Sequence, residues 1–463
     1  MYIEGIDDAP GFAALAQAAR AAGKGIVCIK SGKTELSRVA AASHTASLAG
    51  GGAASSAFLR QVGVAEVNSP AELLETLKIF HMHGPQIGRR LCSLSCSGGE
   101  AGLVADLAAP FGIEFPPLAD AARDRLGAIL GPIVTISNPL DYHTFIWGDG
   151  PRTTDVFTTM LAGYDAGVFI IDPPRPDRCD PASYGPALEA IISAAKTTGK
   201  PAFPVASLSE NFDEGQAIAM MAEGVAPLMG LETALAALRA AQTSAGTQDW
   251  RPLAALPERE AGLLSEAEAK ALLAQAGVAV PRGVSGATLA EVVAKAVGLL
   301  APLALKGLGF AHKTEAGAVR LGLASLAGQA EMPGATGYLA EEMVVGAVAE
   351  VLVGLRRDPI YGVSLTIGMG GVTAEVLADT VTLILPVTQA EVLAAMQQLR
   401  LWPLLDGYRG RPRADVGACA AMAVRLGALM AADDSLEEIE INPVLLRTEG
   451  AVAVDALIRK VAK

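Results

Sequence analysis

His44 lies in a segment whose composition suits a mobile nucleophile. Residues 43–51 read SHTASLAGG and follow an apolar run at residues 25–30 that is typical of a buried strand. An imidazole is a competent nucleophile near neutral pH, and small neighbours leave its loop room to move. The segment suits phosphoryl transfer through a phosphohistidine. Taken alone, it is more simply a surface histidine beside turn glycines.

Ser97, Gly98 and Gly99 are expected where a helix begins, directly after an apolar strand at residues 91–96. The free amides of a first helical turn, together with the helix dipole, favour an anion at that point. Another helix is expected to begin near residues 51–55, after His44. Two such ends could hold a phosphate on the imidazole; the alternative is that the glycines only shape turns.

Lys306 is expected at the end of an apolar strand in the last third of the chain, where its point charge suits a phosphate. A glycine-containing loop with a second histidine, His312, follows at residues 307–317. Glu341 and Glu350 bracket a segment that could contact a nucleotide.

Glu440 and Asn442 are two residues apart, so strand alternation puts them on one face. With Asp455 they offer the carboxylate and amide oxygens that suit Mg²⁺, which takes few protein ligands and completes its shell with phosphates. The alternative is an edge strand whose acidic side chains are solvated. That alternative does not explain why the lysine strand, the possible nucleotide segment and the candidate metal ligands follow one another in this order.

The bulk composition limits the classes of function. The chain has 463 residues, a net charge of −13 and five cysteines without a CxxC pair. This length predicts two to four domains, and the acidity argues against a nucleic-acid or membrane partner. Cysteines in apolar runs are expected to be free thiols in a reducing compartment. Without a long apolar run or a signal-peptide pattern, we expect a cytoplasmic protein.

Strand-like and helix-like patterns alternate over residues 1–245, which predicts parallel sheets with helices on both faces. Residues 242–257 lose this periodicity and gain polar residues and prolines, as a linker does. A helix that begins after Ser265, with Glu268 at its third position, is expected to follow and to run to Gln275. The remainder is expected to be mixed α+β.

Taken together, these segments resemble the NDP-forming acyl-CoA synthetases, relatives of succinyl-CoA synthetase and the ADP-forming acetyl-CoA synthetases. The resemblance extends over essentially the whole chain and rests on YIEGI, IKSG, SHTASLAGG, SCSGGEAGLVAD, NPLDYHT, LKGLGFAHKTEAGAVRLGL, LAEEM, AEVLVGLRRDPIYG, IGMGGVTAEVLAD, YRG and EIEINPVLL with VAVDALI. It implies an α/β fold of flavodoxin-like parallel sheets, as in succinyl-CoA synthetase, followed by an ATP-grasp α+β domain. The implied boundaries are a partial phosphohistidine domain at 1–62, a second flavodoxin-like domain at 63–245, a linker at 246–257 and the ATP-grasp domain at 258–463.

The resemblance also implies an activity, in which a carboxylic acid, CoA and ATP give acyl-CoA, ADP and phosphate. It implies His44 as the phosphohistidine, with Glu4 orienting it at the acyl-CoA site and Glu440 orienting it at the nucleotide site. The other implied roles are phosphate binding by Ser97, Gly98 and Gly99, nucleotide binding by Lys306, Glu341 and Glu350, Mg²⁺ binding by Asn442 and Asp455, and a relay at His312.

The sequence departs from the family pattern in three places. A CoA-binding Rossmann domain is not found in these residues, so we expect a homo-oligomer or a complex with a CoA-binding domain. Two alternatives follow: one subunit or part of such an enzyme, or a non-catalytic, decayed synthetase. Ala46 stands where many members have glycine. Aromatic residues surround Asp141, and they either shape a substrate pocket or pack ordinarily around a loop: Tyr142, Phe145 and Trp147.

Overall fold

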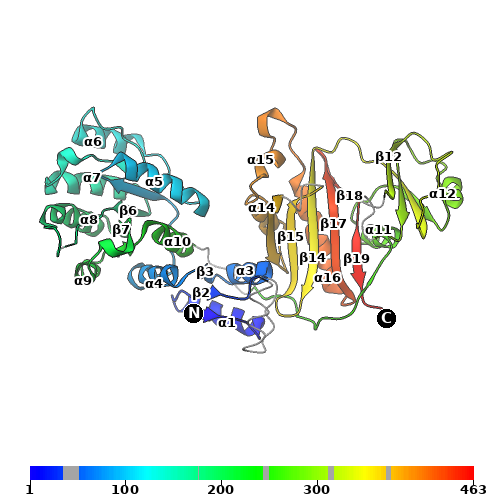
Figure 1. Cartoon of the computed structure of the whole chain (residues 1–463), viewed down its shortest axis with the longest axis horizontal. Helices are drawn as coiled ribbons and strands as arrows, with labels where there is room; N and C mark the ends of the chain where they lie inside the picture. The colour runs from blue at the N-terminus through cyan, green and yellow to red at the C-terminus, as the bar shows by residue number, and fades with distance from the viewer. Residues whose placement is uncertain (35–51, 176, 243–249, 311–316, 372–376, 463) are drawn as a thin grey trace. The chain divides into compact units, whose positions relative to one another are not determined.

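The computed structural model describes residues 1–34, 52–175, 177–242, 250–310, 317–371 and 377–462 (Figure 1). The chain divides into two compact units. The first comprises Met1–Gly5, Gly11–Thr45 and Leu59–Asp249. The second comprises Trp250–Lys463 with the short stretches Ile6–Pro10 and Ala46–Phe58.

A small parallel sheet opens the first unit. Its strands run in the order β1 (Tyr2–Ile3), β2 (Val27–Lys30), β3 (Ala65–Val67). The helices that alternate with them are α1 (Ala9–Ala21), α3 (Gly52–Gln61) and α4 (Pro70–His83). The expected alternation of strand and helix is therefore present from the first residues. The segment of His44, between β2 and α3, lies outside the described residues.

The larger sheet of the first unit has five parallel strands in the order β5 (Leu140–Asp141), β4 (Leu91–Ser95), β6 (Ala166–Ile170), β7 (Ala202–Ala206), β8 (Leu228–Met229). This is the flavodoxin-like order, in which the connections reverse direction between β4 and β6. Ligands bind at such a reversal, beyond the carboxyl ends of the strands.

Both faces of this sheet are buried, as its continuous apolar strands require. Leu91 and Val168 belong to one hydrophobic cluster, whereas their neighbours Cys92 and Phe169 belong to another. The sheet therefore lies between two helical layers. The helices are α5 (Gly98–Ala108), α6 (Asp120–Leu130), α7 (Gly150–Ala162), α8 (Gly185–Thr198), α9 (Glu214–Ala222) and α10 (Leu231–Ala241), with short 3₁₀ turns at Ala109–Phe111, Thr144–Ile146, Ala182–Tyr184 and Ser209–Asn211.

The second unit contains two antiparallel sheets. The smaller has the order β10 (Gly283–Gly286), β13 (Gly337–Glu342), β11 (Leu303–Leu308), β12 (Val319–Leu323), and carries α12 (Leu289–Lys295). Helix α11 (Glu266–Gln275) begins with the expected capping box of Ser265 and Glu268. Lys306 lies inside β11 rather than at its end, which corrects the expectation from the apolar run.

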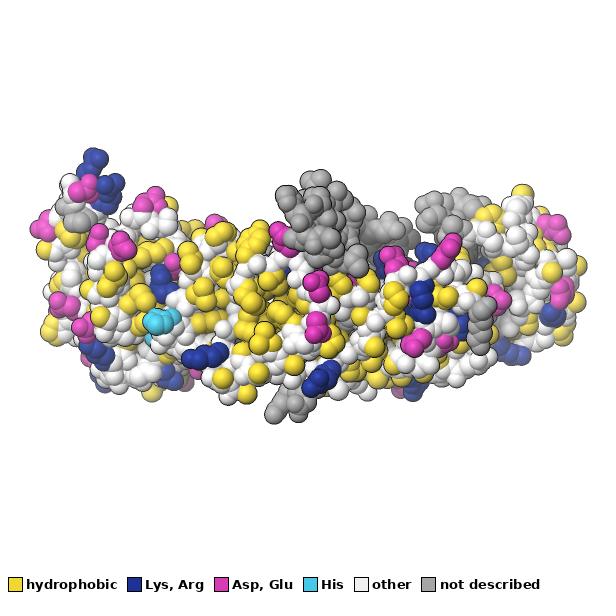
Figure 2. Space-filling model, turned by 90° about the horizontal axis from the view of Figure 1, so that it is seen from below, with side chains coloured by type: hydrophobic (Ala, Val, Ile, Leu, Met, Phe, Trp, Pro, Cys, Tyr) yellow, Lys and Arg dark blue, Asp and Glu magenta, His cyan; other side chains and the backbone are white. Residues whose placement is uncertain are grey.

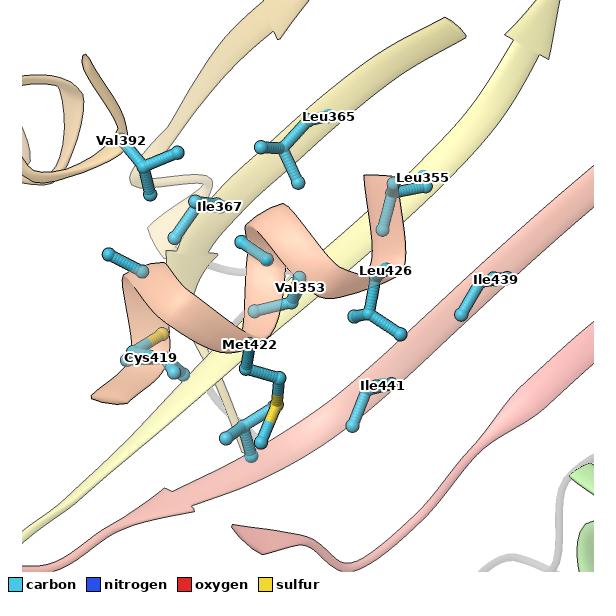
Figure 3. Packing of buried hydrophobic residues seen from close by; sticks show 14 of the residues in the cluster. Val353, Leu355, Leu365, Ile367, Val392, Cys419, Met422, Leu426, Ile439 and Ile441 are labelled. Carbon is cyan, nitrogen blue, oxygen red and sulfur yellow. The ribbon is translucent and has the colours of Figure 1, made fainter. Parts of the chain in front are cut away.

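The larger antiparallel sheet has the order β16 (Thr380–Ile384), β15 (Gly362–Met369), β14 (Ala349–Asp358), β17 (Leu436–Leu446), β19 (Leu457–Lys460), β9 (Gly262–Leu263), and β18 (Ala451–Ala453) also pairs with β17. Among the described residues, the helices beside it are α14 (Gln389–Met396), α15 (Trp402–Leu405) and α16 (Val416–Ala432), with a 3₁₀ turn at Tyr408–Gly410. Figure 3 shows Leu426 of α16 packed toward Ile439 and Ile441 of β17. The opposite face of β17 carries half-buried polar residues.

The observed architecture confirms the predicted fold class, with parallel α/β sheets first and an antiparallel α+β part after them. Among the described residues, no helix is long and apolar enough to cross a membrane. On the face shown in Figure 2, acidic and basic side chains are scattered rather than gathered by sign.

We predict that Leu426→Ala lowers the free energy of unfolding by about 3 kcal/mol, because it leaves a cavity between α16 and the large sheet. Leu426 is fully buried, whereas Leu263 of the same sheet is 58% exposed. Urea unfolding of both alanine variants measures the difference, and we expect Leu263→Ala to change stability by less than about 0.5 kcal/mol. Equal losses would contradict this packing.

Candidate active site

Four charged side chains meet in the second unit, and we call them the lysine–glutamate cluster. Lys306 Nζ lies 2.6 Å from Glu266 Oε1 and 3.1 Å from Glu341 Oε2. Lys270 Nζ lies 2.5 Å from Glu341 Oε1 and 2.9 Å from Glu266 Oε1. All four are buried, with exposed fractions between 3% and 7%. Low exposure makes each of these charges depend on its partners.

The cluster is anchored to the larger sheet by one backbone carbonyl. The Val454 carbonyl accepts hydrogen bonds from Lys306 at 2.6 Å and from Lys270 at 2.8 Å. Burial lowers the pKa of Lys306, but the carboxylates of Glu266, Glu341 and Asp455 outweigh it and raise that pKa overall. Burial, followed by the charge of Lys306, lowers the pKa of Lys270. Lys306 therefore carries the positive charge that a phosphate would need.

The candidate metal ligands lie in one stretch of the larger sheet. Val444 pairs with Ala453 and Glu440 pairs with Leu457, so Asn442 and Asp455 both fall between these two pairs, with Asp455 in the bend that joins β18 to β19. Glu440 and Asn442 are half-buried on the face of β17 opposite to the core, as alternation predicts.

The donor atoms at this place suit a hard cation. Within the described ranges, no three or more His, Cys, Asp or Glu side chains are grouped to hold a metal ion. Asn442 and Asp455 nevertheless supply an amide oxygen and a carboxylate. Asn442 Oδ1 accepts a hydrogen bond from the Gly371 amide at 3.0 Å, which leaves its other lone pair available. Two oxygen ligands of this kind fit Mg²⁺ when phosphates supply others.

Glu350 lies beside the same glycine turn, at the beginning of β14. Its carbonyl accepts from the Gly370 amide at 2.9 Å, and a Cβ on Gly371 would lie 2.2 Å from Glu350 Oε2. Gly371 also has a φ of +77°, so both its conformation and its surroundings require glycine. The turn thus brings Glu350 and Asn442 to one place.

A second candidate site lies at the carboxyl edge of the five-stranded sheet, where Ser97 precedes α5. Ser97 makes no side-chain cap hydrogen bond. In the part of the chain that the structure describes, the amides of Gly98, Gly99 and Glu100 donate to no acceptor. Open amides at a helix beginning favour an anion. The amides of the sequence-predicted residues are therefore open to an anion, and phosphate binding there stays a prediction.

Carboxylates surround this helix end. Asp141 Oδ2 would lie 3.3 Å from a Cβ on Gly98. Asp172, after β6, accepts from the Ser207 amide at 2.7 Å and from Asn211 Nδ2 at 2.8 Å. Burial, with the charges of Asp172 and Asp141, raises the pKa of Glu100 to about 7. Glu100 therefore carries a proton for part of the time near neutral pH, which reduces the negative charge beside the open amides.

Glu4 lies at the carboxyl end of β1 in the three-stranded sheet. Its backbone carbonyl accepts from Lys30 Nζ at 2.5 Å, while its side-chain Oε2 is buried and has no hydrogen-bond partner among the described residues. Burial lowers the pKa of Lys30. No described hydrogen bond or ion pair joins Glu4 to Ser97, Gly98 or Gly99.

The structure thus brings together the sequence-predicted residues of the second unit: Lys306 with Glu341 and Asp455, and Asn442 with Glu350. His44 and His312 lie outside the described residues.

Sequence reasoning missed Glu266 and Lys270, although their spacing of four on a capped helix was a usable signal. It also missed Asp172, which follows an apolar strand, and it gave no role to Glu100. Tyr142 packs against Phe157 and Phe169, whereas Phe145 is half exposed.

Two family models match the chain. Residues 1–80 match the succinyl-CoA ligase like flavodoxin domain, and residues 255–459 match the ATP-grasp domain. The first match includes residues 1–62, for which the resemblance implies a partial phosphohistidine domain. Parallel sheets of this kind followed by an ATP-grasp domain define a nucleotide-dependent ligase.

Relatives resemble the chain over nearly all of its length. It is 30% identical to a trans-feruloyl-CoA synthase of an unknown prokaryotic organism, over 99% of this chain and 68% of the relative. It is 27% identical to an ADP-forming acetate–CoA ligase of Archaeoglobus fulgidus, over 98% of this chain and 69% of that enzyme. The chain belongs to the ADP-forming acyl-CoA synthetases, which are acid–thiol ligases. ATP or ADP and CoA are the substrates that fit this family.

Some relatives are divided into subunits. The chain is 29% identical over 208 residues to the beta subunit of an ADP-forming acetate–CoA ligase of Pyrococcus furiosus, which covers 42% of this chain and 90% of that subunit. Relatives of this chain therefore include single subunits of divided enzymes.

We predict that Glu100→Gln flattens the pH dependence of stability. The folded pKa of about 7 lies above the ordinary value of 4.5, so the folded chain holds a proton that the unfolded chain releases. Stability is therefore lost as pH rises from about 4.5 to 7, and glutamine removes this loss. After allowance for screening at this half-buried group, the variant should be about 1 kcal/mol more stable than wild type at pH 8.

Urea unfolding at pH 5.5 and pH 8 measures this difference. Glu114→Gln changes an exposed carboxylate of the same unit and serves as the matched control. The interpretation of Glu100 fails if wild type and Glu100→Gln lose the same stability between the two pH values.

Proposed function

We propose that the chain couples acyl-CoA formation to ATP cleavage through a phosphorylated His44. In the ligation direction, ATP phosphorylates the imidazole, and the carboxylic acid then takes the phosphoryl group as an acyl phosphate. The CoA thiol displaces phosphate and gives acyl-CoA, so acid, CoA and ATP become acyl-CoA, ADP and phosphate. Phosphoryl transfer depends mainly on positioning and charge neutralisation, which the residues of both candidate sites can provide.

One observation carries the nucleotide half of this proposal. The charged amine of Lys306 shares a buried cluster with Glu341 and lies in the field of Asp455, and Asp455 and Asn442 fall between the same two residue pairs of the larger sheet. A buried cation and two hard oxygen donors of the ATP-grasp domain thus support a site for a nucleotide phosphate and a metal ion. Lys306 would bind the nucleotide phosphates, while Glu341 and Glu350 would complete the nucleotide contacts. Glu440 would orient His44 when it reaches this site, and His312 would act as a relay.

Asn442 and Asp455 would hold Mg²⁺. When bound there, the ion would neutralise phosphate charge and orient the phosphates. Glu440, on the same face of β17 as Asn442, would contact the imidazole.

The acyl half of the proposal rests on the first unit. The open amides of Gly98 and Gly99, beside Ser97, would hold the phosphoryl group, and Glu4 would orient the imidazole through its buried and unpartnered oxygen. The protonated form of Glu100 would favour an anion at this place. A small carboxylic acid and CoA would be the remaining substrates. The buried free thiols of Cys28, Cys92 and Cys419 support a cytoplasmic enzyme.

A second candidate keeps the chemistry but makes this chain dependent on a CoA-binding partner, as the divided relatives favour. We expect this chain alone to bind CoA weakly, and calorimetric titration with CoA measures it. Tight binding by the chain alone would exclude this candidate. Failure to bind ATP with Mg²⁺ would instead support a non-catalytic synthetase.

We predict that His44→Ala abolishes labelling by γ-labelled ATP and Mg²⁺. Wild type should gain an acid-labile, base-stable label, because phosphohistidine has that stability. His81→Ala changes an exposed histidine of helix α4 and should label like wild type. Equal labelling of wild type and His44→Ala would show that His44 is not the carrier, and a label confined to His312 would move the role there.

A further inference from the structure

Lys270 has no part in the chemistry proposed above, although it lies in the same buried cluster as Lys306. It stands four residues after Glu266 on α11, so one helix face presents both. Lys270 donates to both oxygens of Glu341, at 2.5 and 2.6 Å. Its position inside the fold places it away from the solvated surface, where most lysines lie.

The two lysines share the same three acceptors. Lys306 and Lys270 each contact the carboxylates of Glu266 and Glu341 and the carbonyl of Val454. An ammonium group has three donors, so either lysine alone is able to bond all three acceptors. One of the two cations is therefore replaceable by the other.

Charge balance shows why a second cation matters. The four side chains of the cluster are two lysines and two glutamates, and Asp455 adds a negative charge near Lys306. If Lys306 turned toward nucleotide phosphates and no other cation were present, Glu266 and Glu341 would be two buried carboxylates side by side. Buried charges without a partner are strongly unfavourable, so this arrangement would oppose the release of Lys306.

We infer that Lys270 is a positioning residue that releases Lys306 to the nucleotide. Lys270 holds Glu266, Glu341 and the Val454 carbonyl while Lys306 contacts the phosphates. Because Val454 precedes Asp455 and its amide donates to the Pro443 carbonyl of β17, this also keeps Asp455 in place near β17. The inference rests on the proposed nucleotide site and adds a residue to it.

Two substitutions test the inference through their opposite effects on binding. Lys270→Met leaves Lys306 as the only lysine of the cluster beside its two carboxylates, so ATP affinity should fall by about tenfold or more. Glu266→Gln leaves two cations for one carboxylate, so Lys306 is held less tightly and ATP should bind about threefold more tightly or better. Titration calorimetry of the full chain with ATP and Mg²⁺ measures both.

Adenosine separates this role from general damage to the fold. It lacks phosphates, so Lys270→Met should bind it as wild type does. Lys295→Met is the matched control, because Lys295 is half exposed and pairs with Glu291 on the surface of α12. Lys295→Met should change neither the affinity for ATP nor the affinity for adenosine.

The outcomes separate the inference from the nucleotide site on which it rests. If wild type and Lys306→Met bind ATP equally, or neither binds, the nucleotide site itself is wrong. If Lys306→Met loses ATP but Lys270→Met does not, Lys270 has no such role. A parallel loss of adenosine and ATP in Lys270→Met, or weaker ATP binding by Glu266→Gln, would also overturn the inference.

Discussion

The second unit depends on keeping buried charges in balance. Lys306 and Glu341 come from the smaller sheet, Glu266 and Lys270 come from α11, and the Val454 carbonyl comes from the end of β18. A buried ion pair adds little net stability, but the loss of one partner is costly. The cluster therefore contributes mainly by fixing positions. Each of these elements must stay where its charged side chain or carbonyl contacts its partners. That constraint keeps the candidate phosphate-binding amine near Asp455 and β17.

Among the described residues of the first unit, the carboxylates at the candidate anion site are not neutralised by buried lysines. At the carboxyl edge of its five-stranded sheet, open amides of α5 favour an anion, whereas Glu100, Asp141 and Asp172 oppose one. Proton binding by Glu100 relieves part of this conflict. The second unit matches its charges with fixed ion pairs, whereas the first adjusts them by protonation close to neutral pH.

Much of the architecture is readable from local pattern. Apolar runs such as Leu91–Ser95 predict buried parallel strands, and Ser265 with Glu268 predicts the beginning of α11. Alternation along β17 places Glu440 and Asn442 on one face. The lysine–glutamate cluster was not predicted, because Lys270 and Glu341 are 71 residues apart and only tertiary packing joins them. The raised pKa of Glu100 likewise arises from burial and from carboxylates on neighbouring strands.

The shared acceptors of Lys306 and Lys270 have a consequence for how such a chain can diverge. With two cations and two anions in contact, a change of charge at one position is tolerated only with a compensating change at another. Glu266, Lys270, Lys306 and Glu341 should therefore covary in descendants of this sequence. Substitutions at these positions would occur in compensating pairs. The four residues would therefore evolve together, although they come from three elements of secondary structure.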